Sequence, residues 1–209
     1  MLSRRNNSAA GFTLIEMVVT VAIFGVLVAL AIPTMRTWIA DTKVRAVADA
    51  LQNGMRLAQA ESLRRGRQVV FALTNSTNPQ SDFTSGVLTA ANNGNYWVVV
   101  TIPAMIDGSE TPAFVGSGVL TSAGSTVAIQ GPAEVCFNSL GRLVTNSTTS
   151  VAGGTCVPAN AGNNGTPPKY IYNITMTGGN PMNVEMALGG QVHLCDPSQT
   201  LSSSNPYGC

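Results

Sequence analysis

The sequence predicts an α+β fold in which a long N-terminal transmembrane and stalk helix packs on a C-terminal antiparallel β-sheet head. Three observations support this prediction. Residues 12–32 form a 21-residue, mostly apolar run, and about 20 apolar residues are needed for a helix to cross a bilayer. Small and apolar residues then recur every three or four positions, as in an amphipathic helix, at Ala40, Val44, Val47, Leu51, Met55, Ala58 and Ser62. After Arg67 the pattern changes to short β-favouring runs separated by turn residues, which is typical of a sheet.

The apolar run at residues 12–32 contains one charged side chain, Glu16. A carboxylate at the centre of a bilayer costs about 2.5–3.5 kcal/mol, so we expect a partner for it. The alternative is a glutamate that reaches the lipid headgroups and needs no partner. The residues before Gly11 carry only Arg4 and Arg5 as charges. Because basic flanks tend to stay in the cytoplasm, the rest of the chain is expected on the outer side.

Two ordinary interpretations of this segment compete on the residues alone. One is a secretory signal peptide, because Ala29, Leu30 and Ala31 come near a small-residue cleavage site. The other is a plain single-pass anchor that contains an accidental glutamate. The cost of an intramembrane carboxylate argues against an accident.

A short basic leader that ends in Gly11, followed by Phe12 and then Glu16, resembles the class III signal of type IV prepilins and pseudopilins. The resemblance implies that a membrane prepilin peptidase cuts between Gly11 and Phe12 and methylates the new N-terminal Phe12. It implies that the apolar run stays on the mature protein and that Glu16 acts in assembly. Gly25 and Pro33 also stand where such proteins usually carry them.

Together with the change of pattern after Arg67, the resemblance divides the chain into three parts. These are a leader at residues 1–11, a transmembrane and amphipathic stalk helix at 12–66, and a β-rich, pilin-like head at 67–209. The resemblance implies a single-pass inner-membrane protein with its head in the periplasm, which enters an extracellular pilus or a periplasmic pseudopilus on assembly. The implied partners are other pilin or pseudopilin subunits through the N-terminal helix, the prepilin peptidase, and the inner membrane before assembly.

The stalk helix has predictable features at Pro33 and at its end. Pro33 removes one backbone hydrogen bond and crowds the preceding turn, so we expect a kink rather than an end there. We expect the helix to end near Arg65, because Gly66 readily takes the left-handed conformation of a C-cap. Arg65 is expected to pair with Glu61 four residues earlier, with the neighbouring arginines solvating the helix end. A phosphate-binding role for these arginines is the alternative.

The head is expected to consist of short strands joined by turns. Residues 145–168 are rich in Ser, Thr, Asn and Gly and are expected to form a long surface loop. The last turn, Gly189-Gly190, is expected to be a two-residue hairpin loop. Strands are expected at 68–73, 96–102, 115–121, 125–130, 134–137, 170–177, 184–188 and 191–194. Turns are expected at 92–95, 138–141, 178–181 and 189–190.

Two internal segments, 55–71 and 136–142, are similar to segments of FimT/FimU-type minor pilins and GspH-type pseudopilins. One difference from these proteins concerns DNA binding. FimT-like proteins often carry a Gly-Arg-x-Arg stretch on the final hairpin, and some are implicated in DNA capture through it, but residues 189–193 here read Gly-Gly-Gln-Val-His. Residues 68–209 also contain two basic and six acidic side chains, a net charge of −4. Since nucleic-acid affinity comes largely from Lys and Arg, DNA is an unlikely partner.

Four cysteines lie in the expected exported head, where disulfides can form. Three pairings are possible, and the residues alone do not select one. Short loop closure favours Cys136–Cys156 and Cys195–Cys209. A zinc site is the competing interpretation, which the absence of a Cys-x-x-Cys pair disfavours.

Catalysis has little support in the sequence, and we predict no catalytic, cofactor-binding or metal-binding residues. His193 is the only histidine and belongs to no recognised nucleophile motif, so we expect it on a strand surface. The predicted function is therefore that of a non-enzymatic minor pilin subunit of a type IV pilus, acting in filament assembly or at the tip. The alternatives are a GspH-type pseudopilin of a type II secretion system and a DNA-uptake minor pilin.

Overall fold

The computed structural model describes residues 11–103, 110–121, 126–156 and 168–209. Contacts divide the chain into two compact units, Met1–Trp38 and Ile39–Cys209, so the second half of the long helix belongs with the head. In chain order the described elements are α1 (Leu14–Arg65), β1 (Val69–Thr74), α2 (Pro79–Thr84), β2 (Tyr96–Thr101), β3 (Phe114–Val119), β4 (Ala128–Gln130), β5 (Glu134–Phe137), β6 (Leu143–Val144), β7 (Lys169–Thr175), β8 (Met182–Ala187) and β9 (Val192–Cys195).

Helix α1 ends where its capping residues require. Gly66 has a φ of +61°, a conformation that costs glycine least. The N–H of Gly66 donates to Leu63 O at 3.4 Å, and the N–H of Arg67 donates to Ser62 O at 3.2 Å. These two bonds form a Schellman cap, which satisfies carbonyls at the end of the helix. The predicted end at Arg65 and the left-handed Gly66 are confirmed.

The helix is continuous from Leu14 onward and does not end at Pro33. It begins two residues after Phe12, the start expected from the apolar run. The kink at Pro33 stays a prediction.

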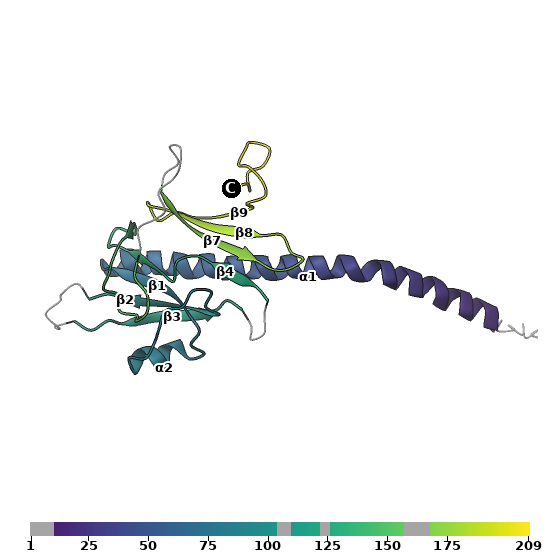
Figure 1. The fold of residues 1–209 in the computed structure, drawn as a ribbon, viewed down its shortest axis with the longest axis horizontal. Coiled ribbons are helices and arrows are strands. Elements are labelled where there is room, and N and C mark those ends of the chain that lie inside the picture. The colour runs from purple at the N-terminus through teal and green to yellow at the C-terminus, as the bar shows by residue number, and fades with distance from the viewer. Residues whose placement is uncertain (1–10, 104–109, 122–125, 157–167) are drawn as a thin grey trace, which may run out of the picture. The chain divides into compact units, whose positions relative to one another are not determined.

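The head contains two antiparallel sheets, which lie on either side of the second half of α1 (Figure 1). The first sheet has the strand order β3-β2-β1-β5-β6, and the second has the order β4-β7-β8-β9. In the first sheet the central strand β1 places Phe71 opposite Val99 of β2 and Val135 of β5. Each pair of named strands in the described head is antiparallel. The α+β class with an antiparallel head is therefore confirmed.

One face of α1 supplies the main core of the head. The buried helix positions pack in one cluster with side chains from both sheets, and burying one large apolar side chain contributes about 1.5–3 kcal/mol. The cluster includes Val44, Val47, Ala48, Leu51, Met55 and Ala58 of α1 together with Phe71, Phe137, Tyr172 and Ile174 of the sheets. The periodic stripe read from the sequence is buried along its whole length, which confirms the amphipathic prediction.

Gly54 lets α1 approach the first sheet closely. A Cβ atom at this position would lie 2.9 Å from Phe71 Cε2 and 2.9 Å from Trp97 Cδ2. These two rings stack on each other with centroids 6.2 Å apart. The absence of a side chain at residue 54 thus makes room for an aromatic pair against the helix.

Strand β1 is buried on both faces, and all six of its residues are inaccessible to solvent. Its second face, which includes Val70 and Ala72, packs with Leu88, Val151 and Cys156 from loop segments. Residues 145–156 form part of the surface loop that the sequence predicts, and within this part Val151 and Cys156 are buried against the sheet. This segment is held by the Cys136–Cys156 disulfide, while residues 157–167 lie outside the described residues.

Most expected strands are present, with differences at their ends. Strand β4 begins at Ala128 rather than Ser125, and Ser125 lies outside the described residues. The hairpin between β8 and β9 closes with a bond from Ala187 N–H to Gln191 O at 3.0 Å, so three residues form the loop instead of two. Gly190 in this loop has a φ of +87°.

Two described elements were not expected from the sequence, α2 and β6. Helix α2 has six residues, mostly polar, and is too short to show a helical apolar period. Strand β6 has two residues, and long-range pairing defines it: Val144 pairs with Cys136, and Leu143 N–H donates to Leu188 O at 3.0 Å.

The close approach at Gly54 generates a testable prediction. Gly54→Ala is expected to destabilise the head by about 1–3 kcal/mol, because the added methyl overpacks the Phe71–Trp97 pair by more than alanine improves helix propensity. Chemical denaturation of the full-length protein in detergent would measure the change. Asn53→Ala is the matched control, since Asn53 is exposed on the same turn, and it should be neutral or slightly stabilising. Equal stability of the two variants would contradict the packing argument.

Candidate functional site

The first turn of α1 holds the residues that the sequence analysis assigns to processing and assembly. Gly11, Phe12 and Thr13 precede the helix. Thr13 caps the helix, because its Oγ1 accepts the Glu16 N–H at 3.3 Å and its carbonyl oxygen accepts the Met17 N–H at 3.2 Å. Thr13 and Glu16 have the spacing of a capping box. The sequence interpretation missed this role of Thr13, although Thr followed three residues later by Glu is a readable signal.

Because Glu16 lies in the first turn of α1, the end of the helix stabilises its carboxylate. This stabilisation offsets only part of the cost of placing a carboxylate in the bilayer. Unpaired backbone N–H groups and the helix dipole stabilise an acidic side chain there by about 0.3–1 kcal/mol. This is less than the cost of a carboxylate at mid-bilayer, about 2.5–3.5 kcal/mol. No side-chain donor bonds the Glu16 carboxylate within the described residues of a single chain. In hydrocarbon, the remaining compensation has to come from a group outside the described residues.

The N-terminal unit leaves a large apolar surface uncovered. Residues 11–32 and 34–39 are all exposed, including Phe12 at 82% and Phe24 at 68%. By length and composition, α1 is long and apolar enough to cross a membrane, and it is the one such helix in the described part of the chain. A helix that is apolar on every side is stable against lipid or against other helices. This surface is therefore the first candidate for a functional contact.

The cysteines belong to the head and form two disulfides. The structure pairs Cys136 with Cys156 and Cys195 with Cys209, as short loop closure favours. The first bridge joins β5 to the segment that covers the first sheet, and the second joins the end of β9 to the C-terminal residue. Backbone bonds support the second bridge, with Asp196 N–H donating to Tyr207 O at 2.7 Å. All four sulfurs are therefore used in crosslinks.

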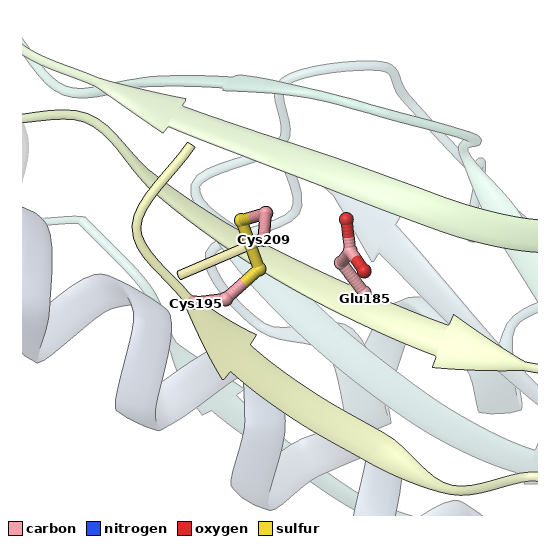
Figure 2. A group of neighbouring side chains, drawn as sticks. All are labelled: Glu185, Cys195 and Cys209. Atoms are coloured by element: carbon pink, nitrogen blue, oxygen red, sulfur yellow. A yellow bond between two sulfur atoms is a disulfide. The ribbon is translucent and has the colours of Figure 1, made fainter. Parts of the chain in front are cut away.

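Glu185, Cys195 and Cys209 lie close together (Figure 2). Their potential ligand atoms fall within 4.8 Å of one another, which is the spacing of a metal site. Figure 2 shows, however, that the two sulfurs are bonded to each other, and zinc binds thiolates rather than a disulfide. The Glu185 carboxylate accepts hydrogen bonds from Lys169 Nζ at 2.7 and 2.6 Å. The cluster is a crosslink beside an ion pair.

His193 lies on β9 opposite Glu185 of β8 and is exposed, which confirms the expected strand-surface position. Since every cysteine is oxidised, neither a thiolate nucleophile nor a Cys-His pair is formed.

The arginines at the end of α1 are matched by carboxylates. Arg64 and Arg65 both bond Glu61, at 2.6 and 2.7 Å, and these bonds lower the pKa of Glu61 to about 2. Arg67 pairs with Glu110. The expected Arg65–Glu61 pair is confirmed, but the expectation that the other arginines are merely solvated is wrong.

These arginines line a cleft of about 500 Å³ together with Glu110, Thr111 and residues 101–103. A phosphate would have to compete there with two carboxylates that already engage the guanidinium groups. The pairing is therefore unfavourable for nucleic-acid binding.

Known protein families match both the N-terminal segment and the head of this chain. Residues 6–32 match the prokaryotic N-terminal methylation motif. Residues 47–178 match the family described as type II transport protein GspH, and this match covers more than half of the chain. The chain belongs to the GspH family. The resemblance to pilin-like proteins is thereby confirmed, and this family of minor pilins and pseudopilins consists of structural subunits.

Relatives of this GspH-family chain include fimbrial proteins of Dichelobacter nodosus. One, named fimbrial protein, is 35% identical over 103 residues, which cover 49% of this chain and 58% of that protein. Another, named type IV major fimbrial protein FimA, is 34% identical over 108 residues, which cover 52% of this chain and 61% of that one. The chain thus spans about three fifths of the length of these relatives.

Among solved structures, the GspH-family chain is similar to the crystal structure of the type IV minor pilin FimU from Pseudomonas aeruginosa. The two share 13% sequence identity with a TM-score of 0.45, over 80% of this chain and 96% of FimU.

The two disulfides of this family member can be tested by mass and by stability. The intact protein is expected to weigh about four hydrogens less than its reduced form, one pair for each bridge. The double variant Cys136→Ser/Cys156→Ser is expected to lose about 2–5 kcal/mol of unfolding free energy. The matched variant Cys195→Ser/Cys209→Ser should lose less, because its bridge holds an exposed tail rather than the cover of a buried strand. Detection of two or more free thiols in the oxidised protein would contradict this assignment.

Proposed function

We propose that this GspH-family chain is a minor pilin subunit of a type IV pilus, contributing to filament assembly or to the filament tip. One observation carries the proposal: the exposed apolar part of α1 begins with a capped turn that contains a single carboxylate. Such a surface suits lipid before assembly and neighbouring helices afterwards. The methylation motif over residues 6–32 and the relatives named as fimbrial proteins support the same function.

Processing creates the partner that Glu16 lacks. In the proposal, prepilin peptidase cuts between Gly11 and Phe12 and methylates Phe12. The new terminal amine is a cation, and on an adjacent subunit it pairs with the Glu16 carboxylate inside the bundle of helices. In the uncut precursor the Phe12 nitrogen is part of the peptide bond to Gly11, so this positive charge is absent. Cleavage and assembly are coupled in this way, and the pair also sets the register between subunits.

The proposal places the chain in the inner membrane, with one span and with the head in the periplasm. The basic residues Arg4 and Arg5 support this orientation. After assembly the subunit lies in an extracellular pilus.

A second candidate is a pseudopilin of a type II secretion system, which the family description favours. Both candidates use the same N-terminal chemistry, so that chemistry does not separate them. Deleting the gene in the source organism separates them. A pilus subunit is expected to be found by mass spectrometry in sheared surface filaments, and its loss should reduce surface pili while leaving protein secretion intact. Loss of secretion with normal pili would overturn the pilus proposal and support the pseudopilin.

A DNA-uptake role is the least favoured alternative. The arginines at the end of α1 are paired with Glu61 and Glu110, and the final hairpin carries no arginine between Gly189 and His193.

Cleavage at Gly11 is directly testable. The mature protein is expected to begin with N-methylated Phe12, and Gly11→Val should block cutting because the added side chain obstructs the peptidase. Intact-mass and N-terminal analysis of membrane-extracted protein would measure both outcomes. Ala9→Val is the control for added bulk outside the cut site and should still be processed. A wild-type protein that retains Met1 would exclude this processing step.

The role of Glu16 is tested by incorporation into filaments. Glu16→Ala should be expressed, processed and inserted in the membrane, but excluded from filaments, because it leaves the Phe12 amine of the neighbour unpaired. The measurement is the amount of protein in sheared filaments relative to the membrane pool.

A control separates this role from helix capping. Thr13→Ala removes the cap, worth about 0.5–2 kcal/mol, but keeps the carboxylate. This variant should still enter filaments. Wild-type incorporation of Glu16→Ala would support the alternative in which the glutamate only reaches the headgroups.

A further inference from the structure

Glu134 is a buried acid that none of the assembly chemistry uses. It is the first residue of β5, pairs with Ala72 of β1, and has no solvent-exposed surface. Its two carboxylate oxygens are the buried side-chain oxygens without a hydrogen-bond partner in the described part of the chain. Leaving a buried polar group unsatisfied costs about 1–3 kcal/mol, and more for a charged group, so such a group needs an explanation.

Residues 145–156, which we name the cover segment, press directly on this carboxyl group. A Cβ atom at Gly154 would lie 2.6 Å from Glu134 Cδ and 2.7 Å from Oε1. The Thr149 hydroxyl is nearby but donates to Val151 O at 2.8 Å. The carboxyl group is thus buried against the backbone at Gly154, with no room for a side chain at residue 154.

Hydrogen bonds join the cover segment to the rest of the head. Ala90 N–H donates to Ala152 O at 2.7 Å, Asn146 Nδ2 donates to Gln68 Oε1 at 2.6 Å, and Ser150 Oγ donates to Thr101 O at 3.1 Å. The Cys136–Cys156 disulfide fixes its C-terminal end. Beneath it lies the second apolar face of the first sheet, formed by Val70, Ala72, Val98 and Val100. Loosening the cover would expose this face.

The groups around Glu134 favour its neutral form. Burial raises the pKa of Glu134 to about 7, and the Thr149 hydroxyl acts on this pKa in the opposite direction with a smaller effect. The titratable group facing it from β7 is Tyr172, whose pKa burial raises well above its usual value, so this phenol stays neutral. The Tyr172 hydroxyl donates to Pro132 O at 2.7 Å and is not available to the acid. The facing residues of β1 and of the cover segment, Ala72, Thr149 and Gly154, carry no charge.

We propose that the cover segment is a pH-sensitive latch, closed over the first sheet while Glu134 is protonated and loosened when Glu134 ionises. In the closed state the nearby Thr149 hydroxyl is bonded to Val151 O, whereas an ionised carboxylate gains water when the segment opens. The direction of the pH dependence follows from the linkage between protonation and stability. Because the pKa is raised in the closed state, the stabilisation is complete below the ordinary pKa of 4.5 and is lost as pH rises through about 7.

Hydrogen exchange of the full-length protein in detergent tests the latch. With exchange rates corrected for the intrinsic effect of pH, protection of the Ala90 amide, which bonds the cover segment, is expected to fall roughly 10- to 30-fold between pH 5.5 and pH 8. Amides of the β7–β8 hairpin, where Tyr172 pairs with Val184, are the internal control and should not change.

Two variants complete the experiment. Glu134→Gln is nearly isosteric and does not titrate, so protection of the cover segment should become independent of pH. Glu110→Gln changes a partly exposed carboxylate elsewhere on the head and should keep the wild-type dependence. Equal protection of the wild-type cover at both pH values would overturn the proposal without reference to any variant. A Glu134→Gln protein that keeps the full pH dependence would also overturn it.

Discussion

The burial of one face of α1 between the two sheets is the constraint on which the head depends. Neither sheet has a closed core of its own, because the apolar faces that meet in the main cluster are completed by helix side chains from Val44 to Ala58. The helix is therefore a layer of the domain rather than an attachment to it. This accounts for a compact unit that begins at Ile39, inside the helix, instead of at the first strand.

The same helix has two incompatible surroundings along its length. Up to Ile39 its described side chains are exposed and mostly apolar, whereas from Ala40 onward one face is buried and the other is polar. The proposed role in a filament would use both properties. The first part supplies a surface that other helices or lipid can cover, and the second part carries the folded head. The Schellman cap at Gly66 and the Thr13 side-chain cap lie at the two ends of this element.

Much of this architecture could be predicted from the sequence because its signals are local. The helical stripe, the glycine at the helix end and the β-favouring runs are properties of short windows. What could not be predicted depends on distant partners. The apolar run of β1 does not indicate that loop residues such as Val151 cover its second face, and two-residue β6 exists through its pairing with β5. Gly54 appears unfavourable for a helix until the rings of Phe71 and Trp97 are placed against it.

The candidate site also contains features that could be predicted from the sequence and features that could not. The N-terminal signal was readable because Gly11, Phe12 and Glu16 stand close together in sequence, and the family match over residues 6–32 agrees with it. The capping role of Thr13 was equally local and was overlooked. The pairing of Arg67 with Glu110 and the enclosure of Glu134 join residues that are far apart or depend on burial. No window of the sequence carries that information.

The packing of one face of α1 against both sheets has a mechanical consequence. A pull along the helix axis would load the stripe from Val44 to Ala58 in shear, against side chains of both sheets at once. Interdigitated side chains in a close-packed interior resist sliding together, whereas a helix lying on a single sheet could peel away one turn at a time. At Gly54 the helix backbone lies close to the Phe71–Trp97 pair, so sliding would bring the side chains of neighbouring turns against these rings. Extraction of the helix along its axis would therefore break its contacts with both sheets together.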